Sequence, residues 1–460
     1  MKLPSGDMLV VGLGVSGDAA AHFLLDHAAK EGGRVVVVDS EDTPGLREAA
    51  ERVAAQGAEV MLGISEVQGE YDLAVVSPGI PPSSPLRLSA QAHSHESIGE
   101  LELAYRVSIS PWIAVTGTNG KTTVTSLIAH LLSSVSIPAI VAGNIGPAAT
   151  QIATASGNST TIVAEVSSFQ LAATHYFHPR VSVLLNITPD HLDWHGSMEA
   201  YTSDKTAIFR NQGSGDTAVI DIDDVGSASL VEFVLEMGVD VRRVSTQMVP
   251  ELGAGMREGV LILATGSGEI ELVHRDELVI KGDHNVSNAL AASAAAYAVG
   301  VGGNHIAAGL RSFEPIAHRL EPLMAVDGVE YVNDSKATNP DATIKALTAF
   351  RDRPLIVLLG GRNKGNSFDD LAICVASACK GAVVFGEAAD TILEALKRAG
   401  FEAVHTEDLE EAVGVAAQMA AEGDVVLLSP ACASFDQFHN YVDRGESFRR
   451  HVETMAGEGM

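Results

Sequence analysis

The residues from Thr116 to Thr123, T-G-T-N-G-K-T-T, combine glycines, hydroxyl groups and one lysine in a short loop. They follow an apolar run at 112–115 and precede a helical pattern at 124–132, which predicts a strand, a loop and a helix. In such a loop, backbone N–H groups and the helix N-terminus point at phosphate groups. Lys121 would reach the β- and γ-phosphates, and the Thr122 hydroxyl would bind Mg²⁺. The segment therefore predicts a nucleoside triphosphate site.

A second glycine-rich turn, G-L-G-V-S-G from Gly12 to Gly17, follows an apolar run at 8–11. A helical pattern through residue 29 and a strand at 34–38, ending at Asp39, complete a βαβ unit. Such a turn holds a diphosphate with backbone N–H groups and a helix N-terminus. A dinucleotide and a uridine diphosphate both carry that group. The phosphate loop in the next segment favours the uridine diphosphate, because a dinucleotide site alone leaves it unexplained.

Two further predicted strands end in residues that could bind a metal ion, at the sheet edge where α/β proteins bind ligands. Glu165 ends the strand at 161–166, and its carboxylate is a natural Mg²⁺ ligand. His191 follows the strand at 181–186 within an H-x-D-x-H sequence. A transition-metal hydrolase would need more His or carboxylate clusters, so we interpret His191 as a ligand to Mg²⁺ beside ATP.

Other polar residues have more ordinary explanations when taken alone. His195 is expected to be exposed or structural, and Lys205 resembles a solvated lysine on a helix. Asn285 opens an alanine-rich helix at 286–299 and could cap it. Asn288 lies inside that helix, where capping does not explain it, and could hydrogen-bond a base or ribose.

The last third of the chain carries three polar loops, at 333–340, 360–365 and 429–438, each after a predicted strand. Loops at the carboxyl ends of neighbouring strands predict a pocket for a second substrate. Arg319 begins this segment as a fixed cation that could stabilise a transferring phosphoryl group. Cys432 is expected to be a buried thiol rather than a nucleophile.

Composition limits the class of protein. The 460 residues suffice for about three domains at ~150 residues each. With 30 basic and 59 acidic residues the formal charge is -29, which argues against nucleic-acid binding. Three cysteines make no disulfide framework, and we find neither a signal peptide nor an apolar run of ~18 residues. We expect a cytoplasmic protein that does not bind membranes.

The alternation of strands and helices predicts an α/β protein of three domains. We expect a Rossmann-like domain at 1–100, a central P-loop domain with a mostly parallel sheet at 101–314, and a second Rossmann-like domain at 315–460. Short alternating runs between 240 and 281 predict a few antiparallel strands at the edge of the central sheet.

Taken together, these loops resemble the Mur ligases, the ATP-dependent amide ligases that build the peptidoglycan stem peptide. The resemblance covers nearly the whole chain, in order. It rests on these motifs: G-L-G-V-S-G, T-G-T-N-G-K-T-T, G-N-I-G, E-V-S-S-F-Q, N-I-T-P-D-H-L-D, G-D-H-N-V-S-N-A-L, H-R-L-E, N-D-S-K-A-T-N and S-P-A-C-A-S-F-D-Q-F. The first and the last two are most similar to the members that add D-glutamate to UDP-N-acetylmuramoyl-L-alanine. The D-N-P-R signature of members that add diamino acids is absent from the sequence.

The resemblance also implies a role for individual residues. The catalytic groups would be Lys121, Glu165, His191, Lys205, Arg319 and Lys336. ATP would be bound by Gly117, Thr118, Asn119, Gly120, Lys121, Thr122, Thr123, Asn285, Asn288, Arg319 and Asp334. The UDP-linked substrate would be bound by Gly14, Val15, Ser16, Asp39, Ser40, Gly79, Asn144, Gln170 and His191. D-Glutamate would be bound by Thr338, Lys364, Ser434, Phe435 and Tyr441. Mg²⁺, expected as two ions, would be bound by Thr122, Glu165, His191 and Lys205, the last carbamylated by CO₂.

The expected reaction forms an acyl phosphate and then a tetrahedral intermediate, in a protein expected to be monomeric. Sister Mur-type or folylpolyglutamate-type ligases share the ATP apparatus, although the diphosphate turn at the N-terminus argues against the latter. Two other classes remain as alternatives. A nicotinamide-dependent oxidoreductase would leave the phosphate loop unexplained. A protein that only binds ATP would leave the polar loops of the last segment unexplained.

Overall fold

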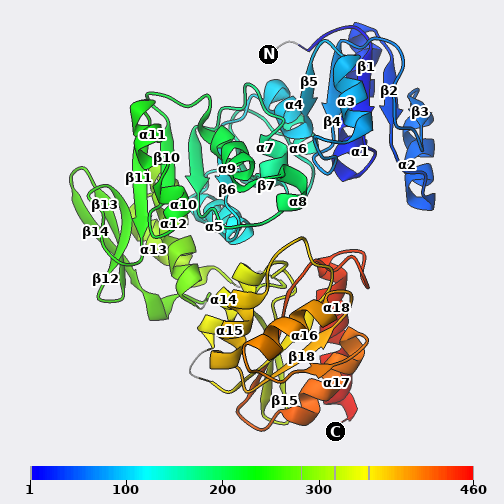
Figure 1. The fold of residues 1–460 in the computed structure, drawn as a ribbon. Coiled ribbons are helices and arrows are strands. Elements are labelled where there is room, and N and C mark those ends of the chain that lie inside the picture. The colour runs from blue at the N-terminus through cyan, green and yellow to red at the C-terminus, as the bar shows by residue number, and fades with distance from the viewer. Residues whose placement is uncertain (1–2, 281, 315–316, 351–352, 459–460) are drawn as a thin grey trace. The chain divides into compact units, whose positions relative to one another are not determined.

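The computed structural model describes residues 3–280, 282–314, 317–350 and 353–458. These residues divide into two compact units. The first contains residues 1–187, 194–275 and 287–311, and the second contains residues 188–193, 276–286 and 312–460. Each unit is built from β-sheets with helices packed against them (Figure 1). Among the described residues, no helix is long and apolar enough to cross a membrane.

The first sheet is fully parallel, with the strand order β3-β2-β1-β4-β5. Its strands are β1 (Met8–Val11), β2 (Val35–Val38), β3 (Glu59–Met61), β4 (Leu73–Val76) and β5 (Ser97–Gly99). The helices of this part are α1 (Val15–Glu31), α2 (Pro44–Ala54), α3 (Pro85–Ala92) and α4 (Glu100–Val107). The continuous apolar strands are buried on both faces, as parallel strands require. Val10 and Val37 pack with α1, whereas Leu9 and Val36 pack with α3 on the other face.

The second sheet is larger, with the order β14-β13-β12-β11-β10-β9-β6-β8-β7. Its strands are β6 (Trp112–Thr116), β7 (Ala139–Gly143), β8 (Thr161–Glu165), β9 (Val181–Leu184), β10 (Thr217–Asp221), β11 (Asp240–Ser245), β12 (Gly253–Arg257), β13 (Val260–Thr265) and β14 (Gly268–His274). The strands from β7 to β12 pair in parallel, and β12, β13 and β14 pair antiparallel. This confirms the predicted antiparallel strands at one edge. Strand β6 lies between β8 and β9, so the phosphate loop emerges where the strand order reverses, a preferred ligand position.

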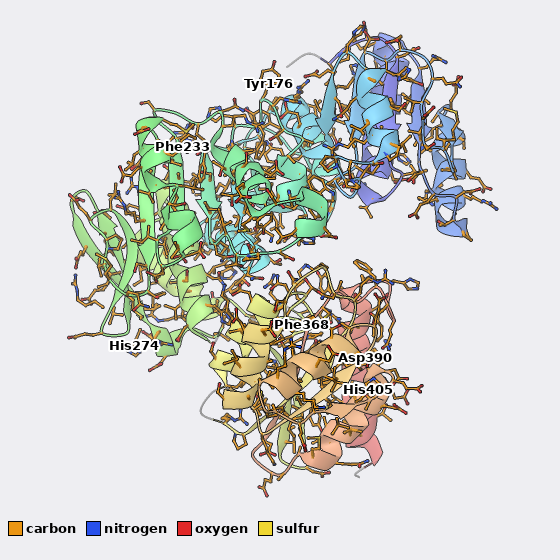
Figure 2. The ribbon with its side chains drawn as sticks, viewed as in Figure 1. Tyr176, Phe233, His274, Phe368, Asp390 and His405 are labelled. Atoms are coloured by element: carbon orange, nitrogen blue, oxygen red, sulfur yellow. The ribbon has the colours of Figure 1, made fainter. Side chains whose placement is uncertain are left out.

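The helices that accompany the second sheet differ widely in length. They are α5 (Lys121–Ser133), α6 (Ala149–Ala155), α7 (Ser168–Leu171), α8 (Leu192–His195), α9 (Met198–Thr206), α10 (Val225–Ala228), α11 (Val231–Glu236), α12 (Asp283–Ala298) and α13 (Gly303–Ser312), with 3-10 turns η1 (Ala207–Phe209) and η2 (Arg275–Glu277). The junction with the first sheet is built around Glu102 of α4, which is fully buried. Its carboxylate accepts hydrogen bonds from the backbone N–H groups of His175, Tyr176 and Phe177 and from Arg106. The Arg106 guanidinium also lies 5.0 Å from the ring centroid of Tyr176, labelled in Figure 2.

The third sheet has the order β15-β16-β20-β17-β18-β19 and is parallel except for the pair β15 and β16. Its strands are β15 (Glu321–Val326), β16 (Val329–Asn333), β17 (Leu355–Gly360), β18 (Gly381–Phe385), β19 (Val404–His405) and β20 (Val425–Ala431). Its helices are α14 (Pro340–Ala349), α15 (Asp369–Ala378), α16 (Ala389–Arg398), α17 (Leu409–Met419) and α18 (Tyr441–Glu458). Val357 and Val384 pack with α14, α15 and α16, and Ile356 and Leu358 pack with α17 and α18. The predicted α/β class with mostly parallel sheets is confirmed.

Candidate active site

The predicted phosphate loop joins β6 to α5, as expected. Gly120 caps α5 with φ +85°, a left-handed conformation that favours glycine. A Cβ atom at this position would lie 2.5 Å from Oδ1 of Asn288, so the helix residue Asn288 lies directly against the loop. The N–H groups of Thr118 and Asn119 donate to the backbone and side-chain oxygens of Asn186. These two N–H groups thus hold the shape of the loop.

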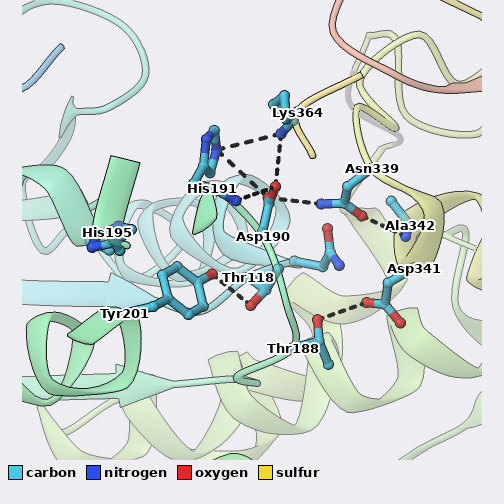
Figure 3. Close-up of polar contacts among 12 residues, drawn as sticks. Thr118, Thr188, Asp190, His191, His195, Tyr201, Asn339, Asp341, Ala342 and Lys364 are labelled. Carbon is cyan, nitrogen blue, oxygen red and sulfur yellow. Dashed lines mark hydrogen bonds and ion pairs between the residues drawn. The ribbon is translucent and has the colours of Figure 1, made fainter. Parts of the chain in front are cut away.

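Two lysines converge on one carbonyl oxygen of this loop. Lys121 Nζ donates to the backbone oxygen of Gly117 at 2.8 Å, and Lys205 Nζ donates to the same oxygen at 2.8 Å. Lys205 is only 2% exposed and lies 4.7 Å from the ring centroid of Tyr201, whose hydroxyl contacts Thr118 (Figure 3). The interpretation of Lys205 as a solvated lysine is therefore wrong, because α9 turns this side chain toward the phosphate loop.

Glu165 lies at the carboxyl end of β8 and is 1% exposed. Its two oxygens accept hydrogen bonds from Thr122 Oγ1 and from Asn144 Nδ2, each at 2.7 Å. A buried carboxylate beside a threonine hydroxyl fits a Mg²⁺ ion, which takes oxygen ligands and keeps several waters. No group of three His, Cys, Asp or Glu suited to a metal ion occurs in the described ranges. The set fits magnesium bound with substrate phosphates better than a metal cage made only by protein.

Behind this group, His195 is held between two elements and its side chain is 0% exposed. Its Nε2 lies 2.9 Å from Ser168 Oγ, and its Nδ1 lies 2.7 Å from the carboxylate of Asp204. The sequence predicted that His195 is either exposed or structural, and these contacts show that it is structural. The neighbouring Gln170 forms a capping box with Ser167 at the start of α7. These bonds join the segment after Glu165 to the helix that carries Lys205.

The diphosphate turn follows β1, and its glycines allow a close approach of strand and helix. A Cβ atom on Gly17 would lie 1.7 Å from the backbone oxygen of Gly12. The carboxylate of Asp39 accepts hydrogen bonds from the N–H groups of Leu13 and Glu41 and so shapes this turn. The other residues predicted to bind the UDP-linked substrate here are exposed or half-buried: Gly14, Val15, Ser16, Ser40 and Gly79. The turn therefore offers backbone and side-chain groups to a ligand.

In the second unit, the predicted D-glutamate residue Lys364 contacts the loop that carries His191 (Figure 3). Lys364 Nζ lies 3.0 Å from Asp190 Oδ1 and 3.4 Å from His191 Nε2. Asn339 Nδ2 donates to the other oxygen of Asp190 at 3.1 Å. Burial would raise the pKa of the Asp190 carboxyl, but the charges of Lys364 and His191 outweigh it and lower the pKa. Asp190 is therefore a charged, buried anchor for Lys364.

The predicted ATP residues of this unit are partly strained and partly buried. Arg319 lies between His318 and Leu320, whose φ angles are +63° and +41°, values that side-chain-bearing residues seldom adopt. Asp334 is 7% exposed and accepts hydrogen bonds from Ser429 Oγ and from the Leu320 N–H group. Burial raises the pKa of Asp334 to about 7, against the opposing effects of Ser429 and Arg319. Asn285 is 8% exposed in the first turn of α12.

The three polar loops predicted to form a pocket are tied together by one buried cation, Arg444 of α18, which is 0% exposed. Its guanidinium donates to backbone oxygens of Ser335, Gly360 and Cys432, one from each loop. Burial lowers the pKa of Arg444 to about 10. The loops that follow β16, β17 and β20 therefore meet around this side chain, as their strand order requires.

The residues predicted for the amino-acid pocket lie in or beside these loops, with different exposure. Lys336 Nζ lies 3.9 Å from the ring centroid of Tyr441. Ser434 is 2% exposed, Thr338 is half-buried and Phe435 is 63% exposed. Cys432 is 1% exposed, and burial raises the pKa of its thiol to about 12, as expected for a residue that is not a nucleophile.

Sequence reasoning missed three of these contributors: Asp190, Arg444 and Ser168. Asp190 lay within a motif that we read only for His191. Arg444 sits in a helix of ordinary charged composition, and no local pattern marks an arginine that will be buried. Ser168 could have been considered, because it follows Glu165 closely in E-V-S-S-F-Q.

Family models match three successive segments of the chain. They are "Mur ligase MurD-like, N-terminal domain" at residues 6–99, "Mur ligase middle domain" at 115–296 and "Mur ligase, glutamate ligase domain" at 318–432. Two similar curated relatives are both named UDP-N-acetylmuramoylalanine–D-glutamate ligase. That of Pelotomaculum thermopropionicum is 44% identical over 451 residues, and that of Salinibacter ruber is 42% identical over 455, each match covering 97% of both chains.

Solved structures agree on the fold. The UDP-N-acetylmuramate-alanine ligase MurC of Thermotoga maritima is 21% identical, with a TM-score of 0.60 over 98% of this chain and 99% of that one. The MurF ligase of Thermotoga maritima, solved in complex with ADP, is 16% identical, with a TM-score of 0.62 over 93% of this chain and 96% of that one. With identities above 40% along nearly its whole length, the chain belongs to the Mur ligase family.

Proposed function

We propose that the protein joins D-glutamate to UDP-N-acetylmuramoyl-L-alanine with cleavage of ATP to ADP and phosphate, in peptidoglycan precursor synthesis. The observation that carries this proposal is the 44% identity to a ligase of that name over 97% of both chains. The match of residues 6–99 to a MurD-like N-terminal model favours this activity over that of a sister ligase. We also propose a cytoplasmic location and a monomeric state.

The proposed division of labour follows three domains, at residues 1–100, 101–314 and 315–460. The first would bind the UDP part at the diphosphate turn. The second would bind ATP at the phosphate loop, with Lys121 and Asn288 among the contacts. The third would bind D-glutamate through Thr338, Lys364, Ser434, Phe435 and Tyr441.

The chemistry begins with transfer of the γ-phosphoryl group of ATP to the alanine carboxylate, which gives an acyl phosphate and ADP. The D-glutamate amine then attacks the carbonyl carbon, and phosphate leaves from the tetrahedral intermediate. Lys121 and Arg319 would offset the negative charge on the transferring phosphoryl group. Lys336 would do the same for the intermediate. Bound Mg²⁺ would supply further charge stabilisation on the phosphate oxygens.

Lys205 is proposed to carry a carbamate and, with Thr122, Glu165 and His191, to bind two Mg²⁺ ions. Two ammonium groups, on Lys121 and Lys205, share the carbonyl oxygen of Gly117 and repel each other. Loss of a proton from the Lys205 ammonium group would give a free amine, whose nitrogen would bond to the carbon of CO₂ and release a second proton to solvent. The resulting carbamate anion would replace the repulsion by attraction and would offer oxygen ligands to a metal ion. Lys205 contacts Gly117 in the phosphate loop, and that loop leads into Thr122, whose hydroxyl donates to Glu165. This position supports the proposal.

The test measures phosphate release from Mg-ATP with bicarbonate present. UDP-N-acetylmuramoyl-L-alanine is added with D-glutamate, L-glutamate or diaminopimelate. Release that needs both the nucleotide sugar and D-glutamate is expected. Release with another amino acid would assign a different member of the family. No release from folded protein in any combination would refute the proposed ligase activity.

A further inference from the structure

Arg87, in the first turn of α3, forms no ion pair with any residue that the structure describes. It is only 7% exposed. One guanidinium N–H donates to the backbone oxygen of Ile80 at 2.8 Å, and the buried Nε has no hydrogen-bond partner among the described residues. Burial lowers the pKa of Arg87, although the charge of Asp204 opposes this effect. The Asp204 carboxylate itself is bound by His195 at 2.7 Å.

A comparison with the other arginines of this part of the chain shows how unusual this is. Before residue 110 the sequence contains four more arginines, Arg34, Arg47, Arg52 and Arg106. Each of the four forms an ion pair with a carboxylate. Among the described residues, none of the ion pairs involves Arg87. A buried, unpaired cation is costly, and an anion that binds beside it recovers that cost.

The surroundings of Arg87 indicate where that anion belongs. The carbonyl group that Arg87 holds is that of Ile80, whose side chain packs against Gly12 of the diphosphate turn. The same loop contributes Ser77, whose hydroxyl donates to the backbone oxygen of Gly12 at 2.8 Å. Arg87 is thus bonded to the loop that packs on the turn. A planar guanidinium also suits phosphate oxygens, which it can bind through two parallel hydrogen bonds.

Trp194 lies near Arg87, within the same unit of the structure. Its ring centroid is 5.8 Å from the guanidinium carbon, and the ring packs on Phe169 with centroids 4.5 Å apart. The indole N–H is buried and also lacks a hydrogen-bond partner within the part of the chain that the structure describes. Two unsatisfied donors, one of them cationic, therefore lie near each other, and the cationic one is bonded to the loop that packs on the diphosphate turn.

We infer that Arg87 and Trp194 form an oxyanion subsite for the diphosphate of the UDP-linked substrate. Arg87 supplies the charge, the ring of Trp194 orients the guanidinium plane, and the indole N–H donates to a neighbouring acceptor oxygen. This inference rests on the proposed function. It adds a cation near a turn that offers uncharged backbone and side-chain groups, in a protein whose formal charge of -29 repels anions.

The test compares Arg87→Met, Arg87→Lys and Trp194→Phe with the wild-type protein. Arg52→Met is the matched control, because it removes one ion-paired arginine from the same part of the chain. Isothermal titration measures binding of UDP-N-acetylmuramoyl-L-alanine, UDP and uridine, and circular dichroism checks folding. Trp194→Phe keeps the ring and removes the N–H group, so it tests the subsite without loss of charge.

We expect Arg87→Met to weaken binding of UDP and of the full substrate roughly 10- to 100-fold, the range for a hydrogen bond to a charged group. In Arg87→Met, the affinity for uridine and the KM for D-glutamate should stay within about twofold of wild type. In the control Arg52→Met, the affinity for UDP should also stay within about twofold. Arg87→Lys should recover part of the loss, and Trp194→Phe should weaken UDP binding by a smaller factor.

Three results would overturn the inference while leaving the ligase proposal intact. These are UDP affinities of Arg87→Met and Trp194→Phe equal to wild type, an equal loss for uridine and UDP, or a loss confined to the full substrate. The last would place the recognised anion in the sugar–alanine half. Wild-type protein that binds neither UDP nor the nucleotide sugar would refute the proposed function and the inference together.

Discussion

Replacement of Asp190 by asparagine tests whether the second unit positions Lys364 for the amino-acid substrate. The substitution keeps the size of the side chain and leaves an oxygen that can accept the hydrogen bond from Asn339. What it removes is the charge that lies 3.0 Å from Lys364 Nζ. The side chains of Asp190 and Lys364 are 6% and 15% exposed, so water screens the pair only weakly.

The expected size of the effect follows from this burial. Loss of one partner from a fully buried ion pair costs about 3–5 kcal/mol, and the partial exposure of Lys364 and the remaining amide reduce this to about 2 kcal/mol. If Asp190 orients Lys364 toward a D-glutamate carboxylate, a similar amount is lost on binding that substrate. The KM for D-glutamate should then rise roughly 30-fold, at 1.4 kcal/mol for each factor of ten.

Phosphate release at varied D-glutamate, with saturating ATP and nucleotide sugar, measures this change directly. The KM values for ATP and for the nucleotide sugar should stay within about twofold of wild type. Asp390→Asn is the control, because Asp390 is an exposed carboxylate on α16 of the same unit (Figure 2). An unchanged KM for D-glutamate in Asp190→Asn would refute the reasoning, since Asp190 would then have no effect on substrate binding. A lower KM would also refute it, since Asp190 would then compete with the substrate carboxylate for Lys364.

Four further predictions concern the scaffold and the loops around it. Glu102→Gln should lower the free energy of unfolding by about 2–3 kcal/mol, because the buried carboxylate accepts hydrogen bonds from several N–H groups. The backbone amides of His175, Tyr176 and Phe177 should exchange hydrogen faster than in wild type, and unchanged protection would contradict the prediction. Burial raises the folded pKa of Asp334 to about 7, above its unfolded value, so protonation favours the folded state and the free energy of unfolding falls as pH rises from the unfolded pKa to about 7. Chemical unfolding measures the free energy of unfolding at pH 5 and at pH 8. The decrease between the two should be up to about 3 kcal/mol smaller in Asp334→Asn than in wild type, and equal decreases would refute this. Arg444→Lys replaces a fork that reaches three loops with a single ammonium group, so the KM for D-glutamate should rise at least tenfold while the KM for ATP changes little; parallel changes in both would argue for general unfolding. Gly120→Ala places a methyl group 2.5 Å from Asn288 at a φ of +85°, so the kcat/KM for ATP should fall more than tenfold, and wild-type kinetics would show that the loop has another conformation.

The sequence predicted the parts of the fold that depend on local pattern. Strand β1 was predicted at its observed bounds, and the phosphate loop was found between the correct strand and helix. These elements follow from a buried apolar run and from glycines that allow unusual backbone angles. Strands β3, β5, β7, β15 and β19 were not predicted. Strand β19 has two exposed residues and β15 lies at a sheet edge, so neither carries a continuous buried pattern.

The side chains that organise the candidate site were harder to predict than the loops themselves. His195 and Asp204 form a bond because helix α9 follows α8 at a particular angle, which no spacing in the sequence records. Arg444 is buried because loops from distant parts of the chain present their carbonyl oxygens to it. Long-range pairing of this kind is decided by tertiary packing, and a single sequence carries no separate signal for it.

The division of the chain into two units has a consequence for protein engineering. The polypeptide passes from one unit to the other after residues 187, 193, 275, 286 and 311. A gene fragment that starts at residue 312 would encode Lys364 and Asn339 but not Asp190, which both of them contact. Exchange of the C-terminal part between related ligases would therefore leave the short 188–193 segment of the recipient to serve a foreign pocket. Chimeras should be designed with that segment exchanged as well, although it lies more than a hundred residues upstream in the sequence.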